Sequence, residues 1–179
     1  MIQGRARVFG DDVNTDYIIS SRRKRETLDP SLLRQYLFED VDPNFAATLA
    51  PGDLIVAGKN FGCGSAMEVA VTALQGAGMK AVLARSFSRT YFRNAVNNGL
   101  IPVTCDTGAI HEGDRVAIAF PDGPIETLPA ECALQVRNET TGVDIAAEPL
   151  SKLLVAIIQA GGLAPFFKQH GNFDLNVAL

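Results

Sequence analysis

The chain has 179 residues, of which 16 are lysine or arginine and 20 are aspartate or glutamate, so its formal net charge is -4. This length and the hydrophobic fraction of 47% are typical of one folded domain, and we expect residues 1–179 to form a single domain. The acidic balance argues against general affinity for nucleic acid or anionic lipid, so binding of a polyanion would require a local basic cluster.

The N-terminal part of the chain predicts a short strand followed by a loop. Residues 5–9 alternate in character, and residues 10–16 are rich in the Gly, Asp and Asn that favour turns. Within this loop, Thr15 and Asp16 on their own fit a capping turn. No apolar segment follows the first basic residues, and apolar runs such as residues 153–158 are too short to cross a bilayer. We therefore expect a protein that is neither exported nor embedded in a membrane.

A run of four cations follows at residues 22–25. It is either a solvated loop or a site at which an anionic ligand relieves the repulsion between the cations. Asp29 and Pro30 then have the pattern of an N-cap and a first helical residue, which predicts a helix that ends near residues 42–43.

The middle of the chain predicts half of a βαβ unit and then its continuation. Residues 54–57 and 81–84 are apolar runs typical of strands buried on both faces. Between them lie a glycine-rich loop at residues 58–64 and a stretch of good helix formers at residues 66–77. The pattern indicates a largely parallel sheet covered by helices.

The remaining sequence predicts one more repeat of this pattern and then a change of architecture. A helix is expected over residues 86–98 and a strand over residues 100–103. The period-2 pattern within residues 113–137, with a turn at residues 121–124, predicts a small antiparallel section. A helix that opens at Pro149 and ends at a Gly-Gly pair should precede a short helical tail.

Ser65 stands where the glycine-rich loop meets the predicted helix. Unpaired backbone N–H groups and the helix dipole would stabilise an anion there, a serine alkoxide included. With Glu68 three residues later, Ser65 also fits a capping box, and the two roles are compatible. Cys63 in the same loop is either a nucleophile or a small packed residue, and the lack of a nearby histidine favours the second interpretation.

The three cysteines, Cys63, Cys105 and Cys132, are odd in number and far apart. This spacing predicts neither a disulfide framework nor a CxxC pair, and it favours a reducing, cytoplasmic setting. Separated thiols also fall short of the four that usually hold an iron–sulfur cluster, so any cluster would belong to another chain. With only two histidines in the sequence, we expect no metal site in this chain.

Three segments together resemble one protein family: DDVNTDYII at residues 11–19, PGDLIVAGKNFGCGSAMEVAVTAL at residues 51–74 and ARSFSRTYFRNAVNNGLIPV at residues 84–103. Their order and spacing are similar to those of the swivel domain of the aconitase superfamily, and specifically to the separate small subunits of 3-isopropylmalate dehydratase and homoaconitase. The resemblance implies an α/β fold, a swivelling three-layer β/β/α domain whose largely parallel sheet continues into a small β-barrel-like section.

The resemblance also implies a hydro-lyase of amino-acid biosynthesis, such as leucine biosynthesis, in which a large subunit carries a 4Fe-4S cluster and the small subunit closes the site. By this resemblance Ser65 would be the catalytic base, whose alkoxide removes a proton next to a carboxylate of a small hydroxy-carboxylic acid. Thr15 and Asp16 match the family's NTD element at the edge of the active site. The other substrate-binding candidates are Gly64, Ala66, Arg22, Arg23 and Arg25.

The chain departs from the family pattern beside Ser65. Where the family reads GSSREHA, residues 64–70 read GSAMEVA, so Ala66, Met67 and Val69 replace a serine, the substrate-binding arginine and a histidine. Methionine cannot make the two-pronged contact with a carboxylate that arginine makes, and its loss would cost roughly 2–5 kcal/mol. Residues 22–26 match the family's substrate-recognition loop and are strongly cationic here. We therefore expect that the binding charge has moved to this loop and that the substrate has several carboxylates.

Two alternatives to an active hydro-lyase stay open. One is a catalytically inactive or regulatory partner subunit of such an enzyme. The other is a nucleic-acid-binding module that uses residues 22–25, which the net charge of -4 disfavours. The sequence leaves open which hydroxy acid is used and whether the isolated chain forms a homo-oligomer.

Overall fold

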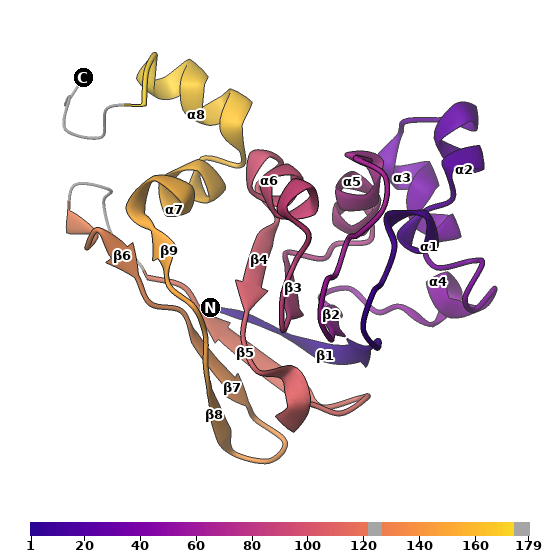
Figure 1. Cartoon of the computed structure of the whole chain (residues 1–179), viewed down its shortest axis with the longest axis horizontal. Helices are drawn as coiled ribbons and strands as arrows, with labels where there is room; N and C mark the ends of the chain where they lie inside the picture. Colours follow the sequence, from indigo (N-terminus) through magenta and orange to yellow (C-terminus); the bar gives the residue numbers. More distant parts are fainter. Residues whose placement is uncertain (122–126, 174–179) are drawn as a thin grey trace.

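The apolar runs of the sequence form the centre of one mixed sheet. The computed structural model describes residues 1–121 and 127–173, and β2 (Leu54–Ala57) and β3 (Ala81–Ala84) are buried at every position. β4 (Ile101–Thr104) pairs with β3, and β1 (Ile2–Val8) pairs with β2, all in parallel. Because the connections between parallel strands must cross over, helices lie above these strands (Figure 1).

The same sheet continues on the far side of β1 with antiparallel strands. β1 is paired in parallel with β2 along one edge and in antiparallel with β5 along the other, where Ile2 lies opposite Ile118. The seven strands have the order β4-β3-β2-β1-β5-β7-β8, and β6 pairs with β9 in a separate two-stranded sheet. The bounds of these later strands are β5 Arg115–Ala119, β6 Glu131–Cys132, β7 Gln135–Asn138, β8 Val143–Ala146 and β9 Leu150–Ser151.

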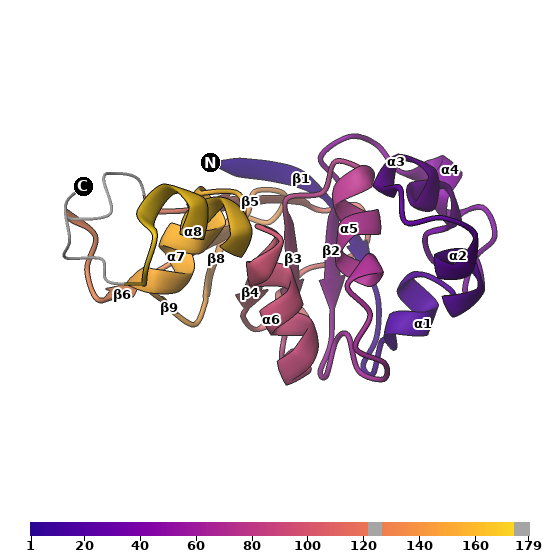
Figure 2. The same ribbon diagram turned by 90° about the horizontal axis from the view of Figure 1, so that it is seen from above.

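The helices divide into a group of short ones and a group of longer ones. Figures 1 and 2 show α1 to α4 gathered at one end of the molecule, α5 and α6 beside the parallel strands, and α7 and α8 towards the other end. No helix among the described residues is long and apolar enough to cross a membrane. Their bounds are α1 Thr15–Ile18, α2 Ser21–Glu26, α3 Pro30–Leu33, α4 Phe45–Thr48, α5 Val69–Gly76, α6 Arg89–Asn97, α7 Lys152–Gln159 and α8 Leu163–His170, with 3-10 helices η1 Arg34–Tyr36 and η2 Thr107–Ala109.

The two faces of the parallel strands belong to two separate hydrophobic cores. Ile55 and Val82 point into a core shared with α1, α3, α4 and α5, whereas Leu54 and Leu83 point into a core shared with β5, β7 and α7. Successive side chains of a strand point to opposite faces, so a strand buried at every position must be covered on both. This arrangement confirms the predicted α/β class, with a parallel sheet that continues into a smaller antiparallel section.

Three predicted elements differ from the structure. The basic residues 22–25 lie in the helix α2 rather than in a loop, because the Ser20 hydroxyl caps it by accepting the Arg22 N–H. The helix that opens at Pro30 ends after η1, where the buried Phe38 adopts a positive φ of 56°.

The third difference concerns the C-terminal third of the chain. Pro149 does not open a helix, because Leu150 and Ser151 first pair with β6, and the Ser151 hydroxyl then caps α7. The turn expected at residues 121–124 falls largely on residues 122–126, outside the described residues.

A buried carboxylate ties the start of β2 to β1. Asp53 is only 2% exposed and accepts hydrogen bonds from Arg5 at 2.7 and 3.2 Å and from the Ala50 N–H at 3.1 Å. Burial raises the pKa of the Asp53 carboxyl, but the hydrogen bonds and charge of Arg5 outweigh it, so the pKa lies below its ordinary value. The charged form of Asp53 therefore stabilises the fold.

We expect Asp53→Asn to lower the free energy of unfolding at pH 7 by about 1.5–3 kcal/mol, the range for hydrogen bonds to charged groups. A carboxyl with a lowered folded pKa stabilises above its unfolded pKa of about 3.9 and loses that contribution as pH falls through the folded value. Urea unfolding at pH 7 and at acidic pH should therefore show the gap between variant and wild type closing in acid. An equal gap at both pH values would contradict this role.

Candidate active site

Two loops lie side by side at the carboxyl ends of β1 and β2. Asn14 and Cys63 form an isolated parallel bridge, the Gly62 N–H donates to the Val13 carbonyl at 2.8 Å, and the Thr15 N–H donates to the Cys63 carbonyl at 2.9 Å. In Figure 2 these loops lie beside α1, on the lower side of the view. Ligands of parallel α/β sheets bind at this edge, outside the carboxyl ends of the strands.

The paired loops fix the backbone of Ser65 and leave its hydroxyl exposed. Thr15 is 1% exposed, and its hydroxyl donates to the Ser65 carbonyl at 2.9 Å. Gly64 has a φ of +90°, and a Cβ there would lie 2.4 Å from the Asn14 side-chain oxygen, so only glycine fits. Ser65 itself is exposed, and its hydroxyl has no hydrogen-bond partner among the described residues. An exposed hydroxyl on a fixed backbone suits proton transfer with a bound molecule.

The predicted capping box is wrong. α5 begins at Val69, its N-cap position is Glu68, and no side chain caps it. The Met67 N–H donates to the Ser65 carbonyl at 2.8 Å, so these residues form a tight turn ahead of the helix. Met67 is 3% exposed and lies in the core shared with α5, which explains why the chain turns inward before the helix starts. The helix dipole consequently acts on Ser65 from a greater distance than we expected.

The site contains polar residues that the sequence did not single out. Asp12 and Asn60 both have positive φ, 56° and 59°, and the Asn60 side-chain amide donates to the Asp12 carboxylate at 2.7 Å. The Asp11 carboxylate accepts the Lys59 N–H at 2.7 Å. Asp and Asn are the non-glycine residues that tolerate this backbone region best, which is the one sequence signal that could have found this pair.

The loop after β3 supports the other side of the glycine-rich loop. The Phe61 N–H donates to the Ser86 carbonyl at 2.9 Å, and the Ser88 hydroxyl donates to the Gly62 carbonyl at 2.6 Å. Ser88 also caps α6, where its hydroxyl accepts the Tyr91 N–H. The Ser65 loop is therefore held between two neighbours, so its position depends on the order of the strands.

The predicted substrate-binding cations differ in their surroundings. Arg23 makes a two-pronged pair with Glu39 at 2.8 and 2.8 Å, and its guanidinium lies 3.7 Å from the centre of the Tyr36 ring. Arg22 is 66% exposed, with one weak contact to Glu39 at 3.5 Å. Lys24 and Arg25 are exposed and form no ion pair with any residue that the structure describes. Arg22 and Arg25 are thus available to a ligand, whereas Arg23 fixes α2.

α2 is connected to the Ser65 loop through α1. Asp16 is half-buried, and its carboxylate accepts the Ser21 N–H at 3.3 Å, which ties α1 to the start of α2. The structure therefore places Thr15 in direct contact with Ser65, and it places Asp16 next to Thr15 in α1. Ala66 is exposed immediately after Ser65.

Cys63 does not have the properties of a nucleophile. Burial and the charge of Asp12 both raise the pKa of the Cys63 thiol, and the thiol donates to the Asp12 carbonyl at 3.4 Å. A nucleophilic cysteine needs the opposite shift, because the thiolate is the reactive form. The interpretation of Cys63 as a small packed residue therefore agrees with the structure.

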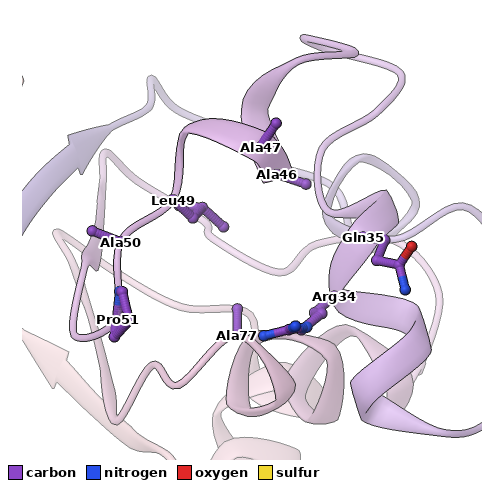
Figure 3. Close-up of a pocket in the computed structure, with 8 residues that line it drawn as sticks. All are labelled: Arg34, Gln35, Ala46, Ala47, Leu49, Ala50, Pro51 and Ala77. Carbon is purple, nitrogen blue, oxygen red and sulfur yellow. The ribbon is translucent and has the colours of Figure 1, made fainter.

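A cavity of about 470 Å³ opens at the opposite edge of the sheet, between η1, α4 and the segment before β2. Figure 3 shows Arg34 extending towards Ala77, and apart from Arg34 and Gln35 the residues of the lining are apolar. None of the predicted site residues lines this cavity. The volume suits a small ligand, but the polar groups that chemistry requires lie at the carboxyl edge.

Comparison with known proteins identifies the family. Residues 35–108 match the Aconitase C-terminal domain family. The 3-isopropylmalate dehydratase small subunit 2 of Archaeoglobus fulgidus is 39% identical over 172 residues, which cover 96% of this chain and 98% of the relative. The chain belongs to this small-subunit family of the aconitase superfamily.

Two further relatives support the family and the fold. The methanogen homoaconitase small subunit of Methanocaldococcus jannaschii is 42% identical and covers 95% of this chain and 93% of its own length. The crystal structure of 3-isopropylmalate dehydratase from the same organism superposes with a TM-score of 0.81 at 40% identity, with 95% of each chain covered. The predicted resemblance and the predicted fold class are therefore confirmed.

We expect Glu39→Gln to loosen α2, because the variant loses the charge that holds Arg23. The pKa of the Glu39 carboxyl is lowered, chiefly by its hydrogen bond from Arg23, so the charged pair is the stable form. Amide hydrogen exchange of residues 21–27 should accelerate about tenfold or more, the equivalent of roughly 1.5–3 kcal/mol.

The matched control is Glu26→Gln, which removes the other carboxylate that contacts Arg23, at 2.9 Å. Glu26 is 49% exposed, so its pair should contribute less than about 0.5 kcal/mol. Equal effects of the two variants would show that the pair with Glu39 does not fix α2.

Proposed function

We propose that this chain is the small subunit of a hydro-lyase that removes water from, and adds it back to, a small hydroxy di- or tricarboxylic acid. The observation that carries the proposal is the exposed Ser65 hydroxyl on a backbone fixed by the Thr15 hydroxyl. The full-length relatives are named as small subunits of 3-isopropylmalate dehydratase and homoaconitase. By the same relationship, the activity requires a large subunit as partner.

In this proposal Ser65 is the base. Its alkoxide takes the proton from the carbon next to a carboxylate and becomes a hydroxyl, while the C–O bond on the neighbouring carbon breaks and a double bond forms between the two carbons. The departing hydroxide takes a proton from solvent to become water, and Ser65 loses its proton to solvent to become an alkoxide again. The reverse steps add water back. The two loops preorganise the serine: its carbonyl is held by Thr15, while its oxygen is open to the substrate.

We assign the 4Fe-4S cluster to the large subunit. Cluster ligands are thiolates, whereas burial raises the pKa of Cys105 to about 12 and also raises that of Cys132. Among the described residues no group of three or more His, Cys, Asp or Glu side chains could hold a metal ion. In the partner, the cluster would supply a Lewis acid for the substrate's oxygen atoms. All three cysteines are free, which suits a reducing compartment such as the cytoplasm.

The exposed charges of α2 favour a substrate with several carboxylates. Met67 is buried, so it offers the substrate neither charge nor hydrogen bonds. Arg22 and Arg25 on α2 are exposed and carry charge that Glu39 does not neutralise fully. An additional carboxylate on the substrate would be recognised by these guanidinium groups, and the apolar branch of isopropylmalate would not.

Ser65→Ala should abolish hydration without preventing assembly with the large subunit. Loss of a general base typically costs 10²–10⁴-fold in rate, and the exposed hydroxyl makes no contact that holds the fold. The measurements are steady-state hydration by the reconstituted pair and its elution volume in gel filtration. Cys63→Ala in the same loop is the control and should retain activity. An active Ser65→Ala enzyme would remove the proposed base.

The reconstituted pair should convert tricarboxylic hydroxy acids with a higher kcat/KM than isopropylmalate. Arg25→Gln should lower kcat/KM for a tricarboxylate about 10–100-fold, as expected for loss of a charged hydrogen bond. Lys24→Gln on the same helix is the control and should have the smaller effect, because an ammonium lacks the fork that fits a carboxylate.

The results with these acids distinguish between the proposed functions of the chain. Efficient turnover of isopropylmalate together with none of the tricarboxylates would contradict the role of α2. Conversion of no acid by an assembled, cluster-loaded pair would contradict the hydro-lyase and favour the inactive partner subunit.

A further inference from the structure

Three arginines line one depression beside the loop that carries Ser65. Arg85, Arg89 and Arg93 surround a hollow of about 320 Å³ together with the half-buried rings of Phe87 and Phe92. Arg89 and Arg93 are four residues apart on α6, so they lie on the same helix face, and Arg85 precedes the helix. We name Arg85, Arg89 and Arg93 the arginine patch.

The charge of the arginine patch is not neutralised within the described chain. Arg85 contacts Asp106 at 3.3 Å, but Asp106 is 80% exposed, so this pair is weak. Arg89 and Arg93 form no ion pair with a described residue, and Glu148 is the one carboxylate that lines the hollow. Three guanidinium groups therefore face two carboxylates, Glu148 and the exposed Asp106, on a chain whose net charge is -4.

Two aromatic rings line the hollow. The Phe87 and Phe92 rings lie 6.1 Å apart, and Phe87 also stacks on the buried Tyr91 at 6.2 Å. Aromatic residues and arginine are the residue types enriched at protein interfaces, where an apolar centre is ringed by charged hydrogen bonds. A small anion in this open hollow would compete with water, whereas a docked protein would exclude the water and strengthen each charged contact.

The patch is joined to the Ser65 loop by direct hydrogen bonds. Ser88 lies between Phe87 and Arg89 and donates to Gly62, three residues before Ser65. The Phe61 N–H donates to the Ser86 carbonyl in the same junction. A protein that covers Ser65 would therefore also lie close to the arginine patch.

We propose that the arginine patch is the docking surface for an acidic segment of the large subunit, whose carboxylates pair with Arg85, Arg89 and Arg93 over the Phe87 and Phe92 rings. This inference rests on the proposed function, because it takes the large subunit as the partner. Docking here would place the partner against the edge of the sheet that presents Ser65. The interaction would be sensitive to salt, because exposed charges attract less strongly at high ionic strength.

The test measures the affinity of the full chain for its copurifying large subunit by calorimetry at low and high salt. The double variant Arg89→Glu, Arg93→Glu should raise Kd about 100-fold and flatten the salt dependence, because each reversal replaces attraction by repulsion. The matched control is Arg34→Glu, Lys80→Glu, which reverses two exposed cations at the opposite edge of the sheet and changes the net charge equally. Circular dichroism checks that each variant is folded. If the charge-reversal variant of the patch does not fold, the milder double variant Arg89→Gln, Arg93→Gln is used in its place.

A Kd of the folded patch variant within about threefold of wild type would overturn the proposal, as would equal weakening by the control pair. Calorimetric titration of the isolated chain with citrate tests whether the patch binds a small anion instead. If the patch variant loses citrate binding but keeps the wild-type affinity for the large subunit, the proposal is also overturned. These readouts are separate from catalysis. A wild-type pair that assembles through the patch but hydrates no acid contradicts the proposed function and leaves the docking surface standing.

Discussion

The pairing of two loops at the carboxyl edge of the parallel strands determines the position of everything else in the proposed site. Main-chain hydrogen bonds join the loop after β1 to the loop after β2, and they can form only because these two strands are neighbours. Such close pairing leaves no room for a side chain at Gly64. The result is a serine whose backbone is fixed and whose hydroxyl is free, which is the combination that catalysis of proton transfer requires.

The charges of the chain are arranged around this edge rather than spread evenly. The chain is acidic overall, yet α2 and the arginine patch place cations on two flanks of the Ser65 loop. Some cations serve the fold: Arg23 is held by Glu39 and Tyr36, and Arg5 by the buried Asp53. The remaining cations are available to a carboxylate on a substrate or on a partner. An anion that approaches this edge of the sheet therefore encounters positive charge, although the net charge of the chain is negative.

The sequence predicted best those strands and helices that are determined by local residue patterns. The strands β2, β3 and β4 and the helices between them follow from continuous apolar runs and from glycines that end helices, and the assembly of Thr15 with Ser65 follows from the family resemblance. The start of α5 was misplaced, because the burial of Met67 in the core outweighed a good capping pattern. The contact between Arg23 and Glu39 could not be predicted, because the two residues lie in different segments of the chain and no periodic pattern in the sequence relates them.

The position of β1 between β2 and β5 has a consequence for synthesis on the ribosome. β1 emerges first, but its second neighbour begins only at Arg115, so one edge of the strand stays open for several seconds at about 5–20 residues per second. Open edges invite wrong pairing, and charged side chains such as Arg7 oppose it. The parallel half can fold while translation continues, whereas the complete sheet must wait for the C-terminal third of the chain.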